Sequence, residues 1–257
     1  MINLFLQNRS TPLIIAHRGS STHAPENTLA AFTLAADQRA DAIELDVTLS
    51  RDGQIVVIHD DTLERTTNGH GRVDQLPYAE VAQCDAGSKF NPKFAGERVP
   101  LLSHVFEAVG QRLLINVELK STTVRSTGLE AKVIDLIRQH GLIERVIISS
   151  FNPLALITVK RTEPRLACGL LYSPDEPIYL SRAWLAPLIP NLDARHPQAS
   201  TVTPEVVKQV HARGQKLNVW TVLEPSEVKT LTALGVDGLI GNDPVMMREV
   251  LEQSSAH

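Results

Sequence analysis

The sequence predicts an α/β fold and, more specifically, a (β/α)₈ TIM barrel. Eight short runs of branched apolar residues have the composition of parallel strands that are buried on both faces. Segments with the 3.6-residue apolar period of helices fill the gaps between these runs. The length of 257 residues suits one barrel domain over residues 1–257, because α/β barrels commonly take about 200 to 250 residues.

The predicted elements alternate along the chain, as a ring of parallel strands with outer helices requires. The predicted strands lie at residues 13–17, 42–47, 113–118, 145–150, 166–171, 191–195, 217–222 and 237–241. The predicted helices lie at residues 29–36, 103–109, 128–140, 153–161, 182–188, 204–213, 226–234 and 244–251. Asn27 or Thr28 can cap the first helix, while Asn242 and Asp243 precede Pro244 and can cap the last.

A ninth strand, at residues 55–58, must pair differently from the others. It follows the second strand too closely for a parallel crossover, so we expect an antiparallel β-hairpin after strand 2. The dipeptide Asp52-Gly53 favours a two-residue type I′ turn. This turn would pair Arg51 with Gln54, Leu49 with Val56, and Asp46 with His59. The hairpin would thus fold His59 back beside Asp46.

The segment from about residue 61 to residue 102 is rich in Gly, Asn, Thr and Pro, with one short helical candidate at 78–84. A segment of this length is too long for a simple loop. We therefore expect a small insertion over the C-terminal face of the barrel, where it would shape the pocket.

Composition restricts the partners and the compartment. The net charge of −4 provides no basic surface for nucleic acid or an anionic membrane. No apolar run approaches the length of a membrane span, and the first residues lack the features of a secretory signal. Cys84 and Cys168 share no motif. We expect a cytoplasmic protein that acts on a small molecule; the oligomeric state cannot be read from the sequence.

Carboxylates occur inside two of the predicted strands. Glu44 and Asp46 share one face of their strand, and Glu118 and Lys120 repeat this spacing. Buried charges are costly unless they are compensated, so three carboxylates at the barrel mouth predict a metal site. Oxygen ligands favour Mg²⁺ or Ca²⁺, with Mn²⁺ possible, over zinc. Taken singly, Lys120 could simply neutralise Glu118, and Asp46 could cap the turn that follows.

Histidine and cationic side chains are predicted at the same mouth. His17 and Arg18 end the first strand, His59 ends the hairpin, and Lys120 follows the third barrel strand. An acidic metal centre with an arginine and a lysine matches a phosphorylated substrate in charge. Two imidazoles can divide the proton transfers between an attacking oxygen and a departing alkoxide. These residues together predict phosphodiester cleavage.

The order and spacing of short motifs identify a family. The motifs are "AHRG" at 16–19, "PENT" at 25–28, "IELDV" at 43–47, "SRDGQIVVIHD" at 50–60, "VELK" at 117–120, "SSF" at 149–151 and "VWTV" at 219–222. With them, the chain resembles the glycerophosphodiester phosphodiesterase family over nearly its full length. The stretch "DAGSKFNPKFAGERVPLL" at 85–102 resembles the insertion of bacterial, cytoplasmic members.

The resemblance implies metal-dependent hydrolysis of glycerophosphodiesters, such as glycerophosphocholine and glycerophosphoethanolamine, to sn-glycerol 3-phosphate and an alcohol. It implies roles for eight residues: His17 and His59 as the acid/base pair, Glu44, Asp46 and Glu118 as metal ligands, Arg18 and Lys120 as phosphate-binding groups, and Trp220 against the alcohol. Glu26 and Asn27 are candidates to hydrogen-bond these residues. Many relatives carry Asp shortly before the final Pro, where this chain has "GNDP" at 241–244, so the roles of Asn242 and Asp243 stay open.

Other readings of the same residues remain. The first is a lysophospholipase D-type phosphodiesterase, although only 4% of the residues are aromatic. The second is a barrel that binds phosphodiesters without cleaving them, and the third is a metal-dependent sugar or keto-acid enzyme. The sequence does not distinguish water from the glycerol hydroxyl as the attacking group, or the acid histidine from the base.

Overall fold

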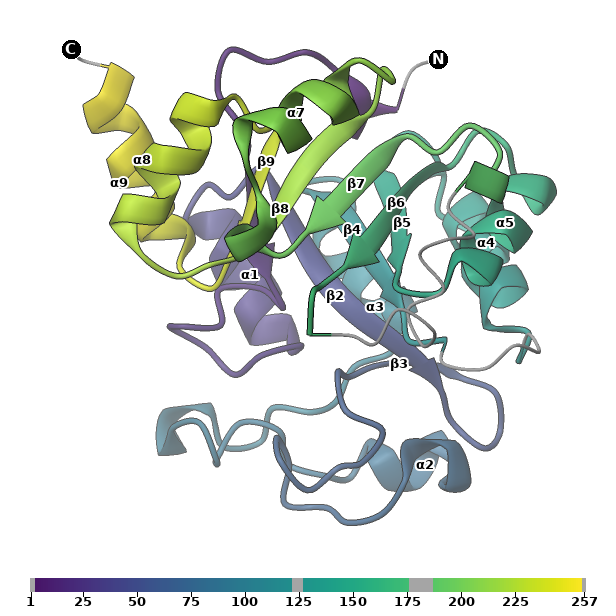
Figure 1. Cartoon of the computed structure of the whole chain (residues 1–257). Coiled ribbons are helices and arrows are strands. Elements are labelled where there is room, and N and C mark those ends of the chain that lie inside the picture. The colour runs from purple at the N-terminus through teal and green to yellow at the C-terminus, as the bar shows by residue number, and fades with distance from the viewer. Residues whose placement is uncertain (1–2, 122–126, 176–186, 256–257) are drawn as a thin grey trace.

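The computed structural model, which describes residues 3–121, 127–175 and 187–255, contains a closed ring of eight parallel strands (Figure 1). The ring consists of β1 (Leu13–His17), β2 (Ala42–Leu49), β4 (Leu114–Leu119), β5 (Val146–Ser150), β6 (Ala167–Tyr172), β7 (Ala194–Pro197), β8 (Lys216–Val222) and β9 (Gly238–Gly241). Each strand pairs with the next, and β9 pairs with β1 to close the ring. The predicted (β/α)₈ barrel is therefore confirmed.

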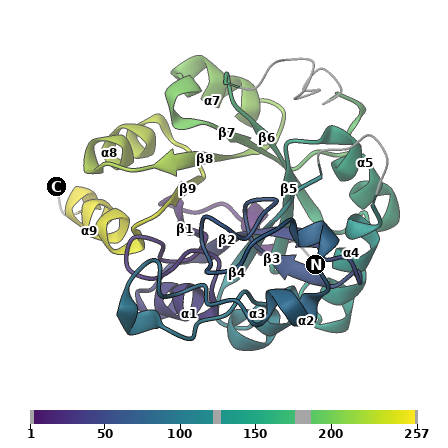
Figure 2. The ribbon, with the colours of Figure 1, turned by 90° about the horizontal axis from the view of Figure 1, so that it is seen from below.

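Helices surround the strands (Figure 2). They are α1 (Leu29–Asp37), α3 (Leu102–Val109), α4 (Leu129–Gln139), α5 (Pro153–Thr162), α7 (Pro204–His211), α8 (Pro225–Leu234) and α9 (Pro244–Ser255). Thr28 caps α1 by accepting a hydrogen bond from the backbone N–H of Ala31, as predicted. Most of the helix predicted at 182–188 lies outside the described residues. Within the described ranges, no helix combines the length and the apolar character needed to cross a bilayer.

Strand β7 begins at Ala194, whereas the sequence predicted a start at residue 191. The reason is the side chain of Asp193, which accepts a hydrogen bond from the backbone N–H of Cys168 at 2.8 Å and pairs with Lys160 at 2.6 Å. Asp193 thus stays in the loop and satisfies a backbone donor at the start of β6. The same kind of hydrogen bond, from a backbone N–H to an aspartate side chain, recurs at two other strands. The side chain of Asp41 accepts from the N–H of Ile14, and that of Asp237 accepts from the N–H of Leu217.

The predicted hairpin is present, but its turn differs from the prediction. Strand β3 (Ile55–Val57) runs antiparallel to β2, with Val47 opposite Val57. The loop has three residues between Ser50 and Gln54, and only Gly53 adopts a positive φ, of 76°. The two-residue type I′ turn is therefore wrong, because it would need positive φ at both turn residues. The extra loop residue shifts the register by one.

The shift changes the partner of Asp46. Its backbone carbonyl accepts a hydrogen bond from the N–H of Ile58, so the predicted pairing with His59 is also wrong. His59 nevertheless follows β3 directly and lines the cavity at the barrel mouth.

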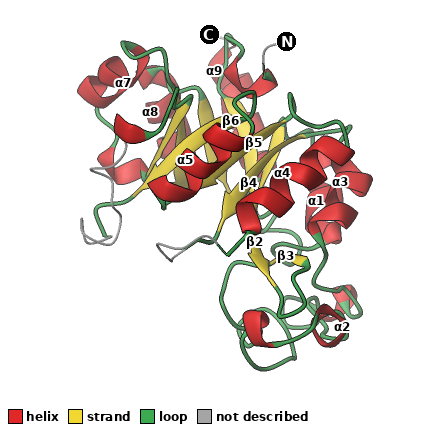
Figure 3. Cartoon of the chain, turned by 90° about the vertical axis from the view of Figure 1, so that its right-hand side faces the viewer, coloured by secondary structure: helices red, strands yellow, loops and turns green. Residues whose placement is uncertain are grey.

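The predicted insertion lies at the end of the barrel to which β2 and β3 project (Figures 1 and 3). It contains the short helix α2 (Tyr78–Val81) and the 3₁₀ turns η2 (Val73–Gln75) and η3 (Pro92–Phe94). Its own apolar cluster consists of Val56, Ile58, Leu63, Val73, Val81, Ala86 and Val99. The insertion therefore packs as a layer with a small core, separate from the core between barrel and helices.

The barrel interior changes from apolar to polar along the strands. Its N-terminal part is filled by Leu13, Ile15, Ala42, Leu114, Ile147, Ala167, Ala194 and Ile240, with Phe5 of η1 (Leu4–Leu6) packed against them. Farther along the strands, four buried polar residues follow: Asn116, Ser149, His196 and Asn218. Burial lowers the pKa of His196 to about 3, so this imidazole is neutral at neutral pH. The polar interior leads up to the cavity.

Gly169 makes room for this imidazole. A Cβ atom at residue 169 would lie 2.4 Å from Nε2 of His196. We predict that Gly169→Ala lowers the free energy of unfolding by about 1–3 kcal/mol through overpacking, measured by urea denaturation. In a His196→Ala background the same change should cost much less. An equal loss in both backgrounds would contradict the assigned contact.

Candidate active site

A cavity of about 370 Å³ opens at the C-terminal end of the barrel. Seven of the eight residues predicted for the site line this cavity: His17, Arg18, Glu44, His59, Glu118, Lys120 and Trp220. Asp46 is fully buried, at 0% exposure, beside the lining residues. The fold therefore gathers side chains from four barrel strands and from the hairpin at one place, where TIM barrels carry their active sites.

The three predicted carboxylates meet at one point. Glu44 and Asp46 lie on β2, and Asp46 stands opposite Glu118 of β4 in the parallel register. Each offers an oxygen, and these oxygens lie within 4.8 Å of one another. All three side chains point into the barrel because residues two apart share one face of a strand.

Burial and mutual repulsion act strongly on these acids. Burial raises the pKa of Glu44 well above its usual value, and the charges of Asp46 and Glu118 raise it further. Burial also raises the pKa of Glu118, although Lys120 opposes this effect. For Asp46, burial is outweighed by the positive charges of Lys120 and Arg18, which hold its pKa below the usual value. Charge is thus favoured most strongly at Asp46 and disfavoured most strongly at Glu44.

The acidic cluster fits a divalent cation. Oε1 of Glu44 and Oδ1 of Asp46 are buried, yet neither accepts a hydrogen bond from the described residues. Buried carboxylate oxygens normally accept a hydrogen bond, so these two remain able to act as ligands, although Oδ1 of Asp46 also lies 3.6 Å from Nζ of Lys120. An all-oxygen set from Glu44, Asp46 and Glu118 suits a hard cation such as Mg²⁺ or Ca²⁺.

A strained turn places Arg18 beside these acids. Arg18 has a φ of 57°, and Gly19 follows with a φ of 83°. A Cβ atom at residue 19 would lie 2.7 Å from Cβ and from the carbonyl carbon of Ala31, so only glycine permits this close approach to α1. The turn directs the backbone N–H of Arg18 to Glu44 Oε2 at 3.1 Å. The Gly of the "AHRG" motif is therefore needed for the position of its Arg.

Two cations neutralise part of the acidic charge. Nε of Arg18 lies 3.5 Å from Asp46 Oδ2. Nζ of Lys120 lies 3.0 Å from Glu118 Oε1 and 3.6 Å from Asp46 Oδ1. Although burial disfavours its charge, Lys120 has a raised pKa because of these two carboxylates, so it remains an ammonium. Both cations line the cavity and can meet an anionic ligand there.

His17 is held by Asn242, a contact that the sequence did not predict. Nδ1 of His17 lies 2.7 Å from Oδ1 of Asn242, so Nδ1–H donates and Nε2 is left toward Glu44 at 3.9 Å. Burial, followed by the charge of Arg18, lowers the pKa of His17 to about 4. The imidazole is therefore neutral at neutral pH.

The helix-capping role predicted for Asn242 is thus wrong, whereas the one predicted for Asp243 is confirmed. Oδ1 of Asp243 accepts from the backbone N–H groups of Val245 and Met246 at the start of α9. Asn242 directly follows β9, and β9 is the neighbour of β1 in the closed ring. Barrel closure was thus the signal that could have placed Asn242 beside His17.

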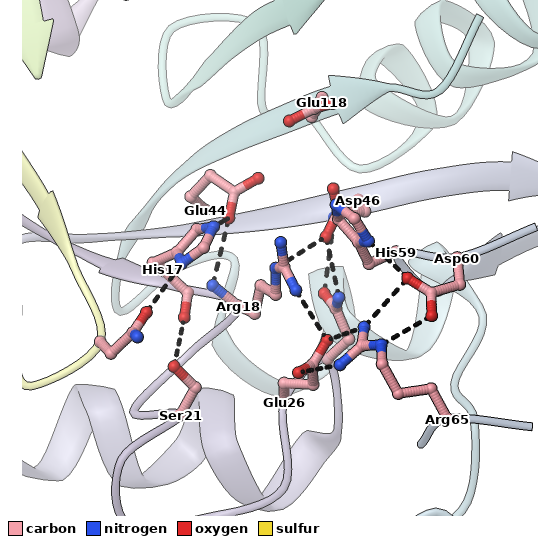
Figure 4. Close-up of polar contacts among 12 residues, drawn as sticks. His17, Arg18, Ser21, Glu26, Glu44, Asp46, His59, Asp60, Arg65 and Glu118 are labelled. Carbon is pink, nitrogen blue, oxygen red and sulfur yellow. Dashed lines mark hydrogen bonds and ion pairs between the residues drawn. The ribbon is translucent and has the colours of Figure 1, made fainter. Parts of the chain in front are cut away.

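His59 is held by an acid that the sequence analysis also missed. Its Nδ1 donates to Oδ1 of Asp60 at 2.6 Å, and Asp60 in turn contacts Arg65 (Figure 4). The predicted contacts of Glu26 and Asn27 are confirmed. Glu26 accepts a hydrogen bond from Arg18 at 2.9 Å, and Nδ2 of Asn27 donates to Asp46 at 2.9 Å.

The cavity lining also includes apolar side chains. Trp220 of β8 meets Phe151 edge to face, with ring centroids 5.6 Å apart and an interplanar angle of 85°. The indole N–H of Trp220 donates to the backbone carbonyl of His196 at 2.7 Å, which fixes the ring. The other apolar lining residues are Leu119, Leu171 and Ile240. The cavity thus offers both charged and apolar contacts to one ligand.

Comparisons with known proteins point to one family. Residues 17–246 match the family model described as the glycerophosphoryl diester phosphodiesterase family. A glycerophosphodiester phosphodiesterase from Caldanaerobacter subterraneus subsp. tengcongensis is 46% identical over 233 residues, which are 90% of this chain and 94% of that protein. A second, from Bacillus altitudinis, is 36% identical over 247 residues, 93% of this chain and 98% of that protein.

A solved structure shares the fold closely. An Oleispira antarctica phosphodiesterase in complex with the product sn-glycerol-3-phosphate superposes with a TM-score of 0.83 and 34% sequence identity. The similarity covers 94% of this chain and 97% of the other.

The opposite electrostatic surroundings of two β2 carboxylates lead to a prediction. At neutral pH and with a chelator present, Glu44→Gln should raise the melting temperature, because it removes a charge that burial and repulsion disfavour. Asp46→Asn should lower it, because Lys120 and Arg18 lose their shared partner. The corresponding change in the free energy of unfolding should fall within the range of about 0.5–3 kcal/mol that is typical of single substitutions. A stabilising Asp46→Asn change would contradict the charge assignment.

Proposed function

The chain belongs to the glycerophosphoryl diester phosphodiesterase family, and we propose that it hydrolyses glycerophosphodiesters such as glycerophosphocholine and glycerophosphoethanolamine to sn-glycerol 3-phosphate and the free alcohol. Membership makes it a phosphoric diester hydrolase. The observation that carries the substrate and mechanism is the convergence of three carboxylates, two cations and two imidazoles on one cavity. The product-bound structure of the Oleispira antarctica phosphodiesterase supports a glycerol phosphate ligand.

In this proposal Arg18 and Lys120 bind the phosphate group. Both are permanently charged and line the cavity, and both are only partly exposed, at 18% and 20% of their side chains. Partial burial strengthens their attraction for a phosphate oxygen compared with cations in water. Arg18 can also present two N–H groups in one plane, which matches the geometry of a phosphate.

Glu44, Asp46 and Glu118 would hold a divalent cation, Mg²⁺ or Ca²⁺, with Mn²⁺ as a further candidate. When bound, such a cation polarises the phosphoryl oxygens and stabilises the negative charge that develops in the transition state. Glu44 Oε1 and Asp46 Oδ1, which accept no hydrogen bond from the described residues, support this assignment.

His17 and His59 transfer the protons. Each imidazole engages its Nδ1 with a neighbouring side chain, Asn242 or Asp60, which leaves Nε2 available to a substrate. One Nε2 accepts the proton of the attacking hydroxyl as its oxygen forms the new bond to phosphorus. The other, which must carry a proton on Nε2 as well as on Nδ1, donates the Nε2 proton to the alcohol oxygen as the old P–O bond breaks. The pair serves attack by water or by the glycerol hydroxyl equally.

Trp220 and its neighbour Phe151 would lie against the apolar part of the alcohol. Their edge-to-face packing keeps both rings in place. A face of this kind contributes contact area and also excludes water from the charged groups that line the cavity.

The decisive experiment incubates the purified protein with glycerophosphocholine and Mg²⁺, Mn²⁺ or Ca²⁺, with a chelator control, and assays released glycerol 3-phosphate. We expect His17→Ala and His59→Ala to abolish turnover, because each removes a proton-transfer group, while calorimetry shows metal affinity largely kept. Glu44→Ala and Glu118→Ala should weaken metal affinity. A His59→Ala variant with full activity would overturn the acid/base assignment.

Substrate size separates the proposal from a lysophospholipase D. The cavity of about 370 Å³ suits a head group better than an acyl chain. We predict a kcat/KM at least about 10-fold higher for glycerophosphocholine than for lysophosphatidylcholine, which corresponds to about 1.4 kcal/mol. Comparable values for both substrates would favour the lipid-cleaving alternative.

A further inference from the structure

Arg65 connects the two sides of the site through a chain of ion pairs (Figure 4). Its Nε donates to Oδ2 of Asp60 at 2.6 Å, and its Nη2 lies 3.1 Å from Oδ1 of the same carboxylate. Its Nη1 and Nη2 donate to the two oxygens of Glu26, both at 2.8 Å. Arg65 therefore holds two carboxylates at once, each through two hydrogen bonds.

The two carboxylates belong to different parts of the fold. Asp60 and Arg65 lie at the start of the insertion, just after the hairpin, whereas Glu26 lies in the loop between β1 and α1. Glu26 also accepts from Nη1 of Arg18 at 2.9 Å. The chain of charges thus runs from His59 through Asp60, Arg65 and Glu26 to Arg18.

The geometry of Arg65 fixes the orientation of Asp60. A planar guanidinium that is paired at both edges leaves a carboxylate little freedom to rotate. Oδ1 of Asp60 is the atom that accepts from Nδ1 of His59. Hydrogen bonds from Arg65 and His59 outweigh partial burial and lower the pKa of Asp60 far below its usual range, so it remains an acceptor. The position of the imidazole therefore depends on Arg65.

The ion pairs of Arg65 are expected to add little to stability. The side chain of Arg65 is 46% exposed, and exposed ion pairs contribute only about 0–1 kcal/mol. Arg72 provides a comparison within the same insertion, because its side chain is also 46% exposed and also pairs with two acids. Its partners are Asp61 and Asp74, and neither His17 nor His59 of the proposed catalytic pair shares these hydrogen bonds.

We propose that Arg65 is a positioning residue for His59: it clamps Asp60 of the insertion to Glu26 of the barrel and so holds the imidazole with Nε2 toward the substrate. The expected effect on kcat rests on the proposed function. The orientation of the imidazole does not depend on that function. Loss of a residue that orients a catalytic group typically costs about 10- to 100-fold in activity.

The test compares Arg65→Ala with the matched control Arg72→Ala. We expect kcat for glycerophosphocholine to fall about 10- to 100-fold in Arg65→Ala and less than about 2-fold in Arg72→Ala, with similar melting temperatures. Arg65→Lys keeps the charge but cannot pair with both carboxylates in one plane, so it should show an intermediate kcat. An unchanged kcat in Arg65→Ala would overturn the proposal, as would equal losses in both alanine variants.

A double-mutant cycle separates positioning from a general structural effect. If Arg65 acts through His59, adding Arg65→Ala to His59→Ala should cost less than about 2-fold more, because no imidazole is left to orient. A p-nitrophenyl ester of glycerol phosphate keeps the residual rates measurable. Independent, multiplying losses would overturn the proposal. Should Arg65→Ala fail to fold, Arg65→Lys carries the same cycle.

A readout without turnover distinguishes failure of this inference from failure of the proposed function. Nitrogen NMR of the imidazole in the wild-type protein should show His59 protonated at Nδ1, and Arg65→Ala should shift it toward a mixture of the two tautomers, whereas Arg72→Ala should not. An unchanged spectrum in Arg65→Ala would overturn the inference even in an active enzyme. The expected shift would uphold it even if glycerophosphocholine were not the substrate.

Discussion

The site depends on one electrostatic constraint, the presence of three buried carboxylates with oxygens within 4.8 Å of one another. Like charges at this distance inside a protein repel strongly, and burial adds the cost of lost hydration. The fold retains the charge of Asp46 by surrounding it with Lys120, Arg18 and the amide of Asn27. Glu44 lacks comparable compensation in the protein alone. Its unsatisfied oxygen is the feature that most directly calls for a cation.

The rest of the barrel accommodates this charge by its arrangement in layers. The apolar layer at the N-terminal ends of the strands supplies a rigid base. The polar layer above it, including Asn116 and Ser149, provides dipoles without net charge below the acids. Gly169 contributes only space, which the ring of His196 fills. A gradual change from apolar to polar to charged avoids placing carboxylates directly against hydrocarbon, which would be costly.

The sequence predicted features that depend on local periodicity. Alternation along β2 and β4 was enough to place Glu44, Asp46 and Glu118 on one inner face. Partners brought together by closure of the ring were missed, because His17 and Asn242 are 225 residues apart and no local pattern joins them. The contact of Arg65 with Glu26 was also missed, because these residues are 39 positions apart and no local pattern joins them. The hairpin was predicted, but its turn was not, because Asp52-Gly53 also fits a three-residue loop that ends in a left-handed glycine.

The insertion is part of the site rather than an addition to its surface. Alternate residues of the β3 segment belong to two cores: Val57 packs with the main core, whereas Val56 and Ile58 pack in the cluster of the insertion. This alternation fixes which way each side chain points, and the next residue, His59, falls on the side of Val57 and faces the cavity. A one-residue slip of this segment would turn the imidazole away from the acids. The small apolar cluster therefore sets the register of this segment and, with it, the face that carries the histidine.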